Sequence, residues 1–127
     1  MIFSNLPDIL ESGKHAYPRR SAIVFGSKVF TYEEIHERAC VVARCLKEKN
    51  IVKGDRVAIL LDNSPEFIFV YFGILMTGAI VVPINHMFKR EEIKYILEDS
   101  GSLLLITHAI YEKTSEELKT MVNGLKD

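Results

Sequence analysis

Apolar residues along this chain follow two alternating periods, which predict helices separated by short strands. After Phe30, apolar side chains recur every three or four positions and form one helical face. Short runs rich in aliphatic residues follow at Arg56–Leu61, Ile80–Val82 and Leu103–Thr107, and turn or capping residues bound each run. The apolar face of the helix after Phe30 consists of Tyr32, Ile35, Ala39, Val42, Ala43 and Leu46.

The start and the end of this helix are marked by local signals. Thr31 and Glu34 have the spacing of a capping box, in which the hydroxyl and the carboxylate each accept a backbone N–H. Phe30 and Ile35 occupy the two positions of the hydrophobic staple that accompanies such a box. Asn50 is placed to adopt the left-handed conformation that ends a helix.

Similar signals predict three further helix ends. Asn5 is expected to cap a first helix, and Ser64 to cap another that has Pro65 at its first position. Gly101 is expected to end a helix over Lys89–Ser100.

A hairpin and a final helix complete the predicted order. Gly26 and Ser27 separate two short strand candidates, and a Gly-X pair suits a two-residue type II′ turn. The last helix is expected to present one apolar side, formed by Ile110, Thr114, Leu118, Met121, Val122 and Leu125.

Helices and strands alternate with short connections, which favours right-handed βαβ crossovers and a parallel sheet. We therefore predict an α/β fold of three layers, a mainly parallel sheet with flanking helices. The helix Phe67–Met76 is apolar nearly all round, so we expect it to be almost wholly buried.

One long uncharged segment could be either a transmembrane helix or part of the buried core. From Phe67 to Phe88 there is no Asp, Glu, Lys or Arg, which is enough length to span a bilayer. Gly78 interrupts the segment, and Pro83 ends a β-branched run that is typical of a strand. Strands of a parallel sheet are buried on both faces and look continuously apolar, so no transmembrane segment is predicted.

Composition narrows the class of protein further. The 127 residues suit one domain, and 16 basic and 17 acidic residues give a net charge of −1 with no basic stripe, so nucleic acid is not an expected partner. Cys40 and Cys45 lie five positions apart on one predicted helix, which suits neither a disulfide nor a zinc site. Free thiols and an N-terminus without a long apolar run favour a cytoplasmic protein.

Common catalytic and phosphate-binding motifs are missing. The sequence has no GxxxxGK[ST], GxGxxG or GxSxG, and its histidines have no acidic partner at a meaningful spacing. The loop 62–65 follows a predicted strand, where open α/β folds bind ligands. Its residues, Asp, Asn, Ser and Pro, are also those of an ordinary helix cap, which we favour.

His86, Lys89 and Arg90 form a polar and basic cluster just after the strand that Pro83 closes. A solvated helix start is the favoured interpretation of such a cluster.

Five segments occur in the order typical of one family. The chain resembles the N-terminal region of the AMP-forming acyl-activating enzymes, which include acyl-CoA synthetases, luciferases and the adenylation domains of peptide synthetases. Phe30–Ile35 resembles their first core motif, Leu75–Asn85 resembles the second, and Asn85–Gly101 looks closest to fatty-acyl-CoA synthetases. The five segments are Pro18–Ala22, Phe30–Ile35, Lys53–Ile59, Asn63–Phe67 and Gly73–Asn85.

This resemblance implies an acid–CoA ligase that uses ATP, Mg²⁺ and CoA to convert a carboxylic acid, with a fatty acid expected, to its adenylate and then its thioester. The family's phosphate loop, ribose-binding aspartate and catalytic lysine lie further along and have no counterpart here. Residues 1–127 are thus expected to be an N-terminal fragment of an AMP-binding domain, inactive and free of cofactor alone, with no catalytic or metal residue. In family members that use CoA, the loop with His86, Lys89 and Arg90 can approach the CoA nucleotide.

Two other functions stay open at this point. One is a non-catalytic interaction module that retains the fold, and the other is a small flavodoxin-like ligand binder, disfavoured by the missing phosphate loop. A homodimer through exposed apolar surface is also expected.

Overall fold

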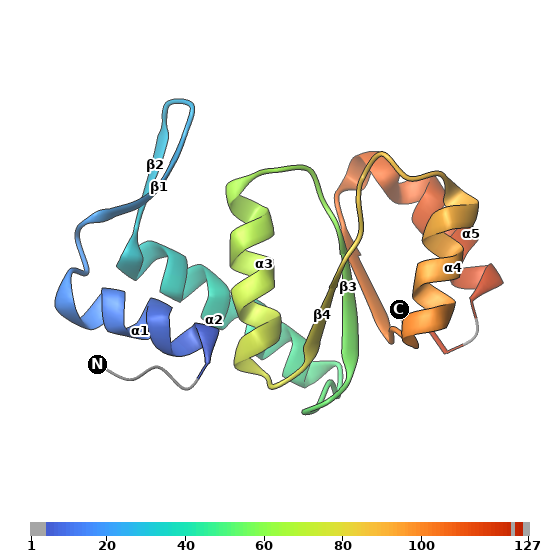
Figure 1. Cartoon of the computed structure of the whole chain (residues 1–127), viewed down its shortest axis with the longest axis horizontal. Helices are drawn as coiled ribbons and strands as arrows, with labels where there is room; N and C mark the ends of the chain where they lie inside the picture. Colours follow the sequence, from blue (N-terminus) through green and yellow to red (C-terminus); the bar gives the residue numbers. More distant parts are fainter. Residues whose placement is uncertain (1–4, 123, 126–127) are drawn as a thin grey trace.

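The computed structural model describes residues 5–122 and 124–125, and within them helices and strands alternate as predicted (Figure 1). The elements are α1 Leu6–Ala16, β1 Ser21–Phe25, β2 Lys28–Thr31, α2 Tyr32–Glu48, β3 Arg56–Leu60, α3 Pro65–Met76, β4 Ile80–Pro83, α4 Arg90–Ser100, β5 Leu104–Thr107, the 3₁₀ turn η1 Ala109–Tyr111 and α5 Glu112–Met121.

A parallel sheet with strand order β4-β3-β5 forms the centre of the molecule. Arg56 pairs with Ile80 on one side of β3, and Val57 pairs with Leu104 on the other. The three strands are those predicted from the sequence. The α/β class and the parallel sheet are therefore confirmed.

Helices cover both faces of the sheet and give the three predicted layers (Figure 1). On one face, Val57 and Ile59 of β3 join a cluster with residues of α2 and α3. On the other, Ala58 and Leu60 join a cluster with α4 and α5. These four side chains of β3 are at most 1% exposed, so β3 anchors both cores at once.

A third, smaller cluster joins α1 and the β1–β2 hairpin to the helices α2 and α3. Its buried members are Leu10, Ile35, Ala39 and Phe69, and the ring of Phe30 meets that of Phe69 edge-on at 5.2 Å. The hairpin itself projects away from the sheet (Figure 1). Gly26 has a φ of +60° and Ser27 does not share a positive φ, which fits the predicted type II′ turn.

The predicted helix ends are confirmed by their hydrogen bonds and backbone angles. Thr31 N donates to Glu34 Oε2 at 2.8 Å while Glu34 N donates to Thr31 Oγ1 at 3.2 Å, which completes the capping box. Asn5 and Ser64 accept the backbone N–H groups of Asp8 and Phe67, and Asn50 and Gly101 have φ values of 63° and 64°.

Helices α2 and α3 approach each other closely at Gly73. A Cβ atom on this residue would lie 2.5 Å from Val42 Cβ and 3.0 Å from the carbonyl oxygen of Ala39. Such distances are below van der Waals contact, so the packing of these two helices requires the absence of a side chain at this position.

Two expectations of burial need correction. In α3, Phe69, Val70, Gly73 and Ile74 are buried, but the remaining residues of 67–76 are only half-buried, because the sheet, α1 and α2 leave one sector of the helix uncovered.

Ile110 does not face inward with Leu118. It is 67% exposed, because η1 precedes α5 and changes the helical phase before the apolar side begins.

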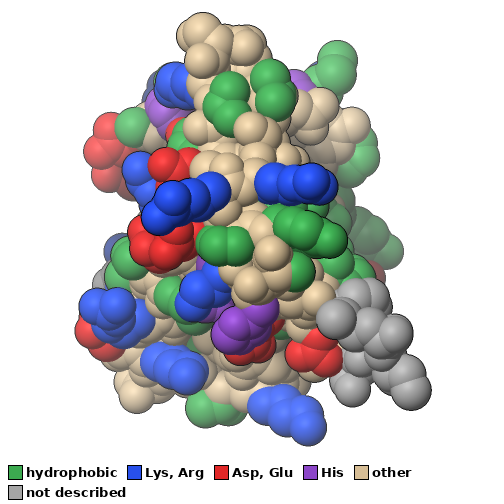
Figure 2. Space-filling model, turned by 90° about the vertical axis from the view of Figure 1, so that its left-hand side faces the viewer, with side chains coloured by type: hydrophobic (Ala, Val, Ile, Leu, Met, Phe, Trp, Pro, Cys, Tyr) green, Lys and Arg blue, Asp and Glu red, His purple; other side chains and the backbone are tan. Residues whose placement is uncertain are grey.

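The uncharged segment that follows Phe67 forms core elements, the helix α3 and the strand β4. Within the described residues, no helix has both the length and the apolar character needed to cross a membrane. On the side of the molecule shown in Figure 2, Lys, Arg, Asp and Glu are interspersed with apolar side chains, and no field of one sign forms.

Candidate functional site at the carboxyl ends of the strands

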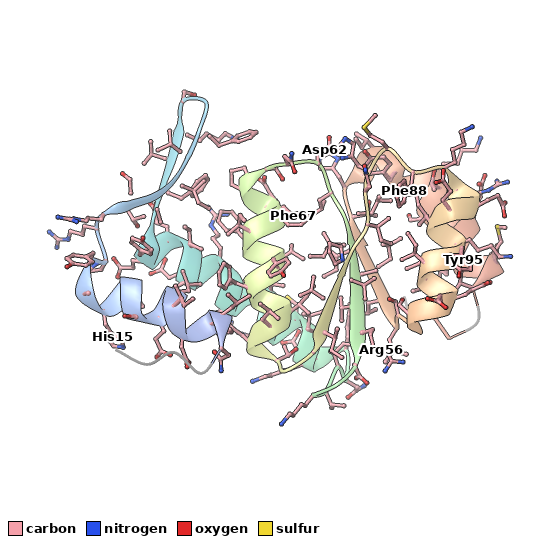
Figure 3. The ribbon with its side chains drawn as sticks, in the orientation of Figure 1. His15, Arg56, Asp62, Phe67, Phe88 and Tyr95 are labelled. Carbon is pink, nitrogen blue, oxygen red and sulfur yellow. The ribbon has the colours of Figure 1, made fainter. Side chains whose placement is uncertain are left out.

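The carboxyl ends of β3, β4 and β5 meet at one edge of the sheet, and a polar residue follows each strand there. Asp62 follows β3, His86 follows β4, and Tyr111 lies in η1 after β5. In Figure 3, Asp62 lies at this end of the molecule, and Arg56 marks the opposite end of β3. This is the edge at which open parallel sheets bind ligands.

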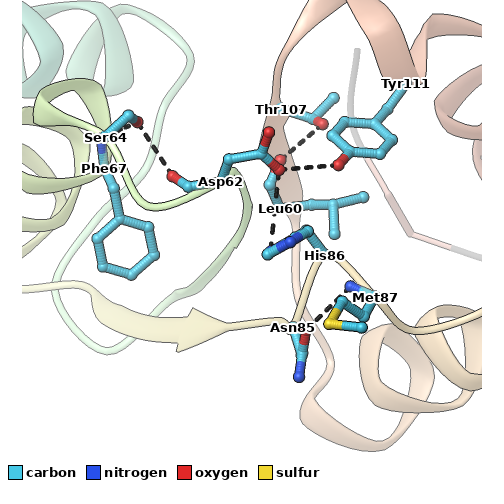
Figure 4. A network of polar contacts seen from close by, with 9 residues as sticks. All are labelled: Leu60, Asp62, Ser64, Phe67, Asn85, His86, Met87, Thr107 and Tyr111. Atoms are coloured by element: carbon cyan, nitrogen blue, oxygen red, sulfur yellow. Dashed lines mark hydrogen bonds and ion pairs between the residues drawn. The ribbon is translucent and has the colours of Figure 1, made fainter.

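The side chain of Asp62 connects the other two residues. Tyr111 Oη donates a hydrogen bond to Asp62 Oδ1 at 3.0 Å, and His86 Nδ1 lies 3.8 Å from the same oxygen (Figure 4). Side chains from three segments that are distant in sequence thereby meet at one carboxylate. The sequence predicted no acidic partner for the histidines at a meaningful spacing, and the contact of His86 with Asp62 joins residues that are distant in sequence. The prediction is wrong for His15, whose Nε2 lies 3.8 Å from Glu11 Oε1, four positions earlier on α1.

This arrangement raises the pKa of Tyr111 above its ordinary value. The main cause is the hydrogen bond to Asp62, and partial desolvation and the negative charge of the carboxylate add to it. The phenol therefore stays protonated across the physiological range and acts as a donor.

Further hydrogen bonds hold the two flanking loops. Thr107 Oγ1 donates to the carbonyl oxygen of Leu60 at 2.8 Å, which joins the ends of β3 and β5. Ser64 Oγ donates to the carbonyl oxygen of Asp62 at 3.0 Å and accepts from Phe67 N at 3.4 Å. The favoured helix-cap interpretation of this loop is confirmed for Ser64, while Asp62 holds η1.

Two cavities of about 390 and 370 Å³ open on either side of this loop. Neither is lined by a Lys or Arg side chain, so neither offers the cations that would balance a triphosphate. Within the described residues there is also no group of three His, Cys, Asp or Glu side chains that could hold a metal ion. The first is lined by Phe25, Leu61, Asp62, Asn63, Ser64, Glu66, His108 and Ile110, and the second by Leu61, Asn63, Phe67, Pro83, Ile84, Asn85, His86 and Met87.

Of the three residues that the resemblance places near the CoA nucleotide, the structure separates His86 from Lys89 and Arg90. His86 lines the second cavity and faces Asp62. Lys89 is the N-cap of α4, and its backbone N–H donates to Glu92 Oε1 at 3.1 Å. Arg90 begins α4 and turns to α5, where Nη1 contacts Glu117 Oε2 at 2.6 Å.

Lys89 and Arg90 line a shallow hollow between α4 and α5 that sequence reasoning did not find. Lys113 and Glu117 of α5 complete it, and both are more than 20 positions away from Arg90 in the chain. The hydrogen bond with Glu117 raises the pKa of Arg90 and lowers that of Glu117, so both groups stay charged at neutral pH. Glu117 competes there with any anion for Arg90.

Comparison with known proteins identifies the family. The family model described as AMP-binding enzyme matches residues 10–127. The crotonobetaine/carnitine–CoA ligase of Citrobacter koseri is 35% identical over 130 residues, which cover 95% of this chain and 25% of that enzyme. The chain therefore belongs to the AMP-binding enzyme family, as the five ordered segments predicted.

Solved structures agree with this assignment. The anthranilate–CoA ligase AuaEII, in complex with anthranoyl-AMP, superimposes with a TM-score of 0.90 at 29% identity, over 98% of this chain and 24% of that chain. A fatty acyl-CoA synthetase of Mycobacterium tuberculosis superimposes with a TM-score of 0.87 at 32% identity, over 95% and 25%. The chain thus spans about a quarter of the length of these relatives.

Proposed function

We propose that this chain is the N-terminal portion of an AMP-forming acid–CoA ligase, with residues 1–127 as part of a larger AMP-binding domain. The observation that supports it most is the match of nearly the whole fold to the corresponding quarter of CoA ligases. The complete enzyme would use ATP, Mg²⁺ and CoA on a carboxylic acid, a fatty acid in our proposal, in the cytoplasm.

The described residues do not supply an adenylation site by themselves. Adenylation needs donors around the phosphates, a magnesium site and stabilisation of the departing pyrophosphate. The cavities at the strand ends lack Lys and Arg, and no metal-binding group occurs among the described side chains. We therefore propose that the 127-residue chain does not adenylate acids alone and serves as scaffold.

A chimaera tests this function directly. Residues 1–127 replace the corresponding quarter of the Citrobacter koseri ligase, and ATP–pyrophosphate exchange is measured with a panel of carboxylic acids. Retained exchange by the chimaera, with none by the 127-residue chain, is the expected result. A chimaera that is folded but lacks exchange would contradict the proposal and favour a non-catalytic interaction module.

For the cluster at the start of α4, we propose that His86, Lys89 and Arg90 contact the CoA nucleotide. Lys89, Arg90 and Lys113 line one hollow together with Glu91 and Glu117, and its three cations would suit a phosphate group that displaces Glu117 from Arg90. His86 stands apart beside Asp62 and would contact the nucleotide from the neighbouring loop.

The two half-reactions separate this role from a structural one. In the chimaera, Lys89→Ala or Arg90→Ala should raise the KM for CoA by about two- to fivefold, as expected for exposed charges, with pyrophosphate exchange unchanged. Glu117→Gln should lower the KM for CoA, because it releases Arg90 from its ion pair. Lys94→Ala, on the same helix and paired with Glu98, is the matched control. Equal effects of Lys89→Ala and Lys94→Ala would contradict the CoA contact.

A further inference from the structure

Helix α2 brings a thiol and an imidazole together, away from the strand ends. His36 and Cys40 are four positions apart on this helix, so their side chains lie on the same side of it. Cys40 Sγ lies 3.7 Å from His36 Nδ1 and 3.9 Å from His36 Nε2. Because both residues belong to one helix, the contact requires no other segment of the chain.

The imidazole is placed to accept the proton of the thiol. A neutral imidazole has one donor nitrogen and one acceptor nitrogen. Both nitrogens of His36 lie near Cys40 Sγ, so the acceptor is close to the sulfur in either tautomer. Burial, and next the charge of Lys14 on α1, lower the pKa of His36 from 6.5, so most of the imidazole is neutral at pH 7 and can act as a base.

The other cysteine of the chain lacks this arrangement. Cys45 is exposed, whereas Cys40 is half-buried. The residue four positions before Cys45 is Val41, whose side chain offers no base. Exposure alone would make Cys45 the more reactive thiol, while a neighbouring base would favour Cys40. Cys45 is therefore a matched reference for the effect of His36.

The surroundings of the pair indicate which kind of reagent it would accept. The half-burial of Cys40 favours a small reagent. Acidic and basic groups both act on His36, so neither an anion nor a cation is favoured there. Sulfur is a strong nucleophile towards activated carbon. The charged and titratable groups that act on His36 are Lys14, Glu11 and His15 of α1 and Glu37 of α2.

We propose that Cys40 is a nucleophilic thiol with His36 as its general base, and that it adds to small, neutral α,β-unsaturated carbonyl compounds. The S–H bond breaks and its proton passes to a ring nitrogen of His36, while the sulfur forms a bond to the β-carbon of the electrophile. The electron pair of the double bond moves into an enolate, and the imidazolium returns the proton to the α-carbon. The product is a thioether, and the step needs no oxidant and has no leaving group. This inference does not depend on the proposed function.

Labelling with N-ethylmaleimide at pH 7, followed by mass spectrometry of the intact 127-residue chain, tests the proposal. Cys45→Ser and Cys40→Ser each leave one thiol, whose rate is measured alone. A free thiol is only a few per cent thiolate at pH 7, which leaves room for Cys40 to react about tenfold faster than Cys45. If Cys40 reacts no faster than the more exposed Cys45, the proposal is overturned.

A second comparison isolates the base. His36→Gln removes the base and keeps a polar side chain, so it should slow Cys40 by about tenfold and leave the rate of Cys45 unchanged. A folding defect cannot imitate this result, because unfolding would expose Cys40 and speed its labelling. An unchanged rate of Cys40 in His36→Gln overturns the proposal, and so does an equal slowing of Cys45.

Discussion

Tyr111 Oη and Asp62 Oδ1 lie 3.0 Å apart, and this hydrogen bond joins residues that are 49 positions apart in the chain. It ties η1 to the loop after β3, while Thr107 ties the strands just below it. The strand ends are thus held by side chains as well as by the sheet. A loss of this bond should be measurable in the stability of the fold.

Replacing Tyr111 by Phe should destabilise the fold, because it removes the hydroxyl that donates to Asp62. The loss should be small, because Asp62 is exposed to water. Urea unfolding followed by circular dichroism gives the value. Tyr95→Phe, at a position that is 68% exposed, is the control, and an equal loss there would contradict the role of the bond.

Gly73→Ala should cost about 1–3 kcal/mol, because its Cβ would overlap Val42 and the α2 backbone. Thermal unfolding of the single variant measures the loss. The double variant Gly73→Ala, Val42→Ala should lose less stability than the two single variants lose together, because removing the Val42 side chain makes space for the new methyl group. Strict additivity would show that the helices are not in contact there.

Thr31→Ala should destabilise α2 by about 1 kcal/mol, since it removes the hydroxyl that accepts the N–H of Glu34. Thr31→Ser keeps an equivalent acceptor and should stay near the native stability. Chemical denaturation of the three proteins compares them. The interpretation of the capping box fails if the serine variant is as unstable as the alanine variant.

His36 is expected to make stability depend on pH. Burial, and next the nearby charge of Lys14, lower its pKa from the ordinary 6.5, against the opposing effects of Glu11 and Glu37. The unfolded chain therefore binds a proton at a higher pH than the folded chain does. This contribution to stability is complete above pH 6.5 and is lost as the pH falls from there through the folded pKa.

The free energy of unfolding, measured in steps below pH 7, should fall with pH in the native chain and fall less steeply in His36→Gln. His15, one of the other groups near His36, lies on α1 and is kept in both proteins. An identical pH dependence in the two proteins would show that His36 does not carry this effect.

Local signals in the sequence predicted the local structure well. The capping box at Thr31, the left-handed stop at Asn50 and the cap at Ser64 each depend on residues within a few positions of one another. The strands also followed from their composition, since a strand buried on both faces needs a continuous apolar run.

The site was less predictable, because its contacts join distant segments. Asp62 was recognised as a residue at a strand end, but nothing in the sequence pairs it with Tyr111 or His86. Arg90 was grouped with its sequence neighbours, whereas the fold turns its guanidinium to Glu117 on another helix. The sequence predicted that Ile110 faces the core, because no apolar pattern distinguishes a 3₁₀ turn from the α-helix that follows it. The turn has a different period, so the prediction failed there.

The central position of β3 has a consequence for the chain as it is synthesised. Arg56 pairs with Ile80 of β4, whereas Val57 pairs with Leu104 of β5, which is synthesised later. Until then β3 can pair with β4, but the edge of β3 that later pairs with β5 has no partner. Strand β3, which is buried in the folded chain, is therefore exposed on one side during synthesis. We expect a chaperone that binds extended apolar segments to bind β3 at that stage.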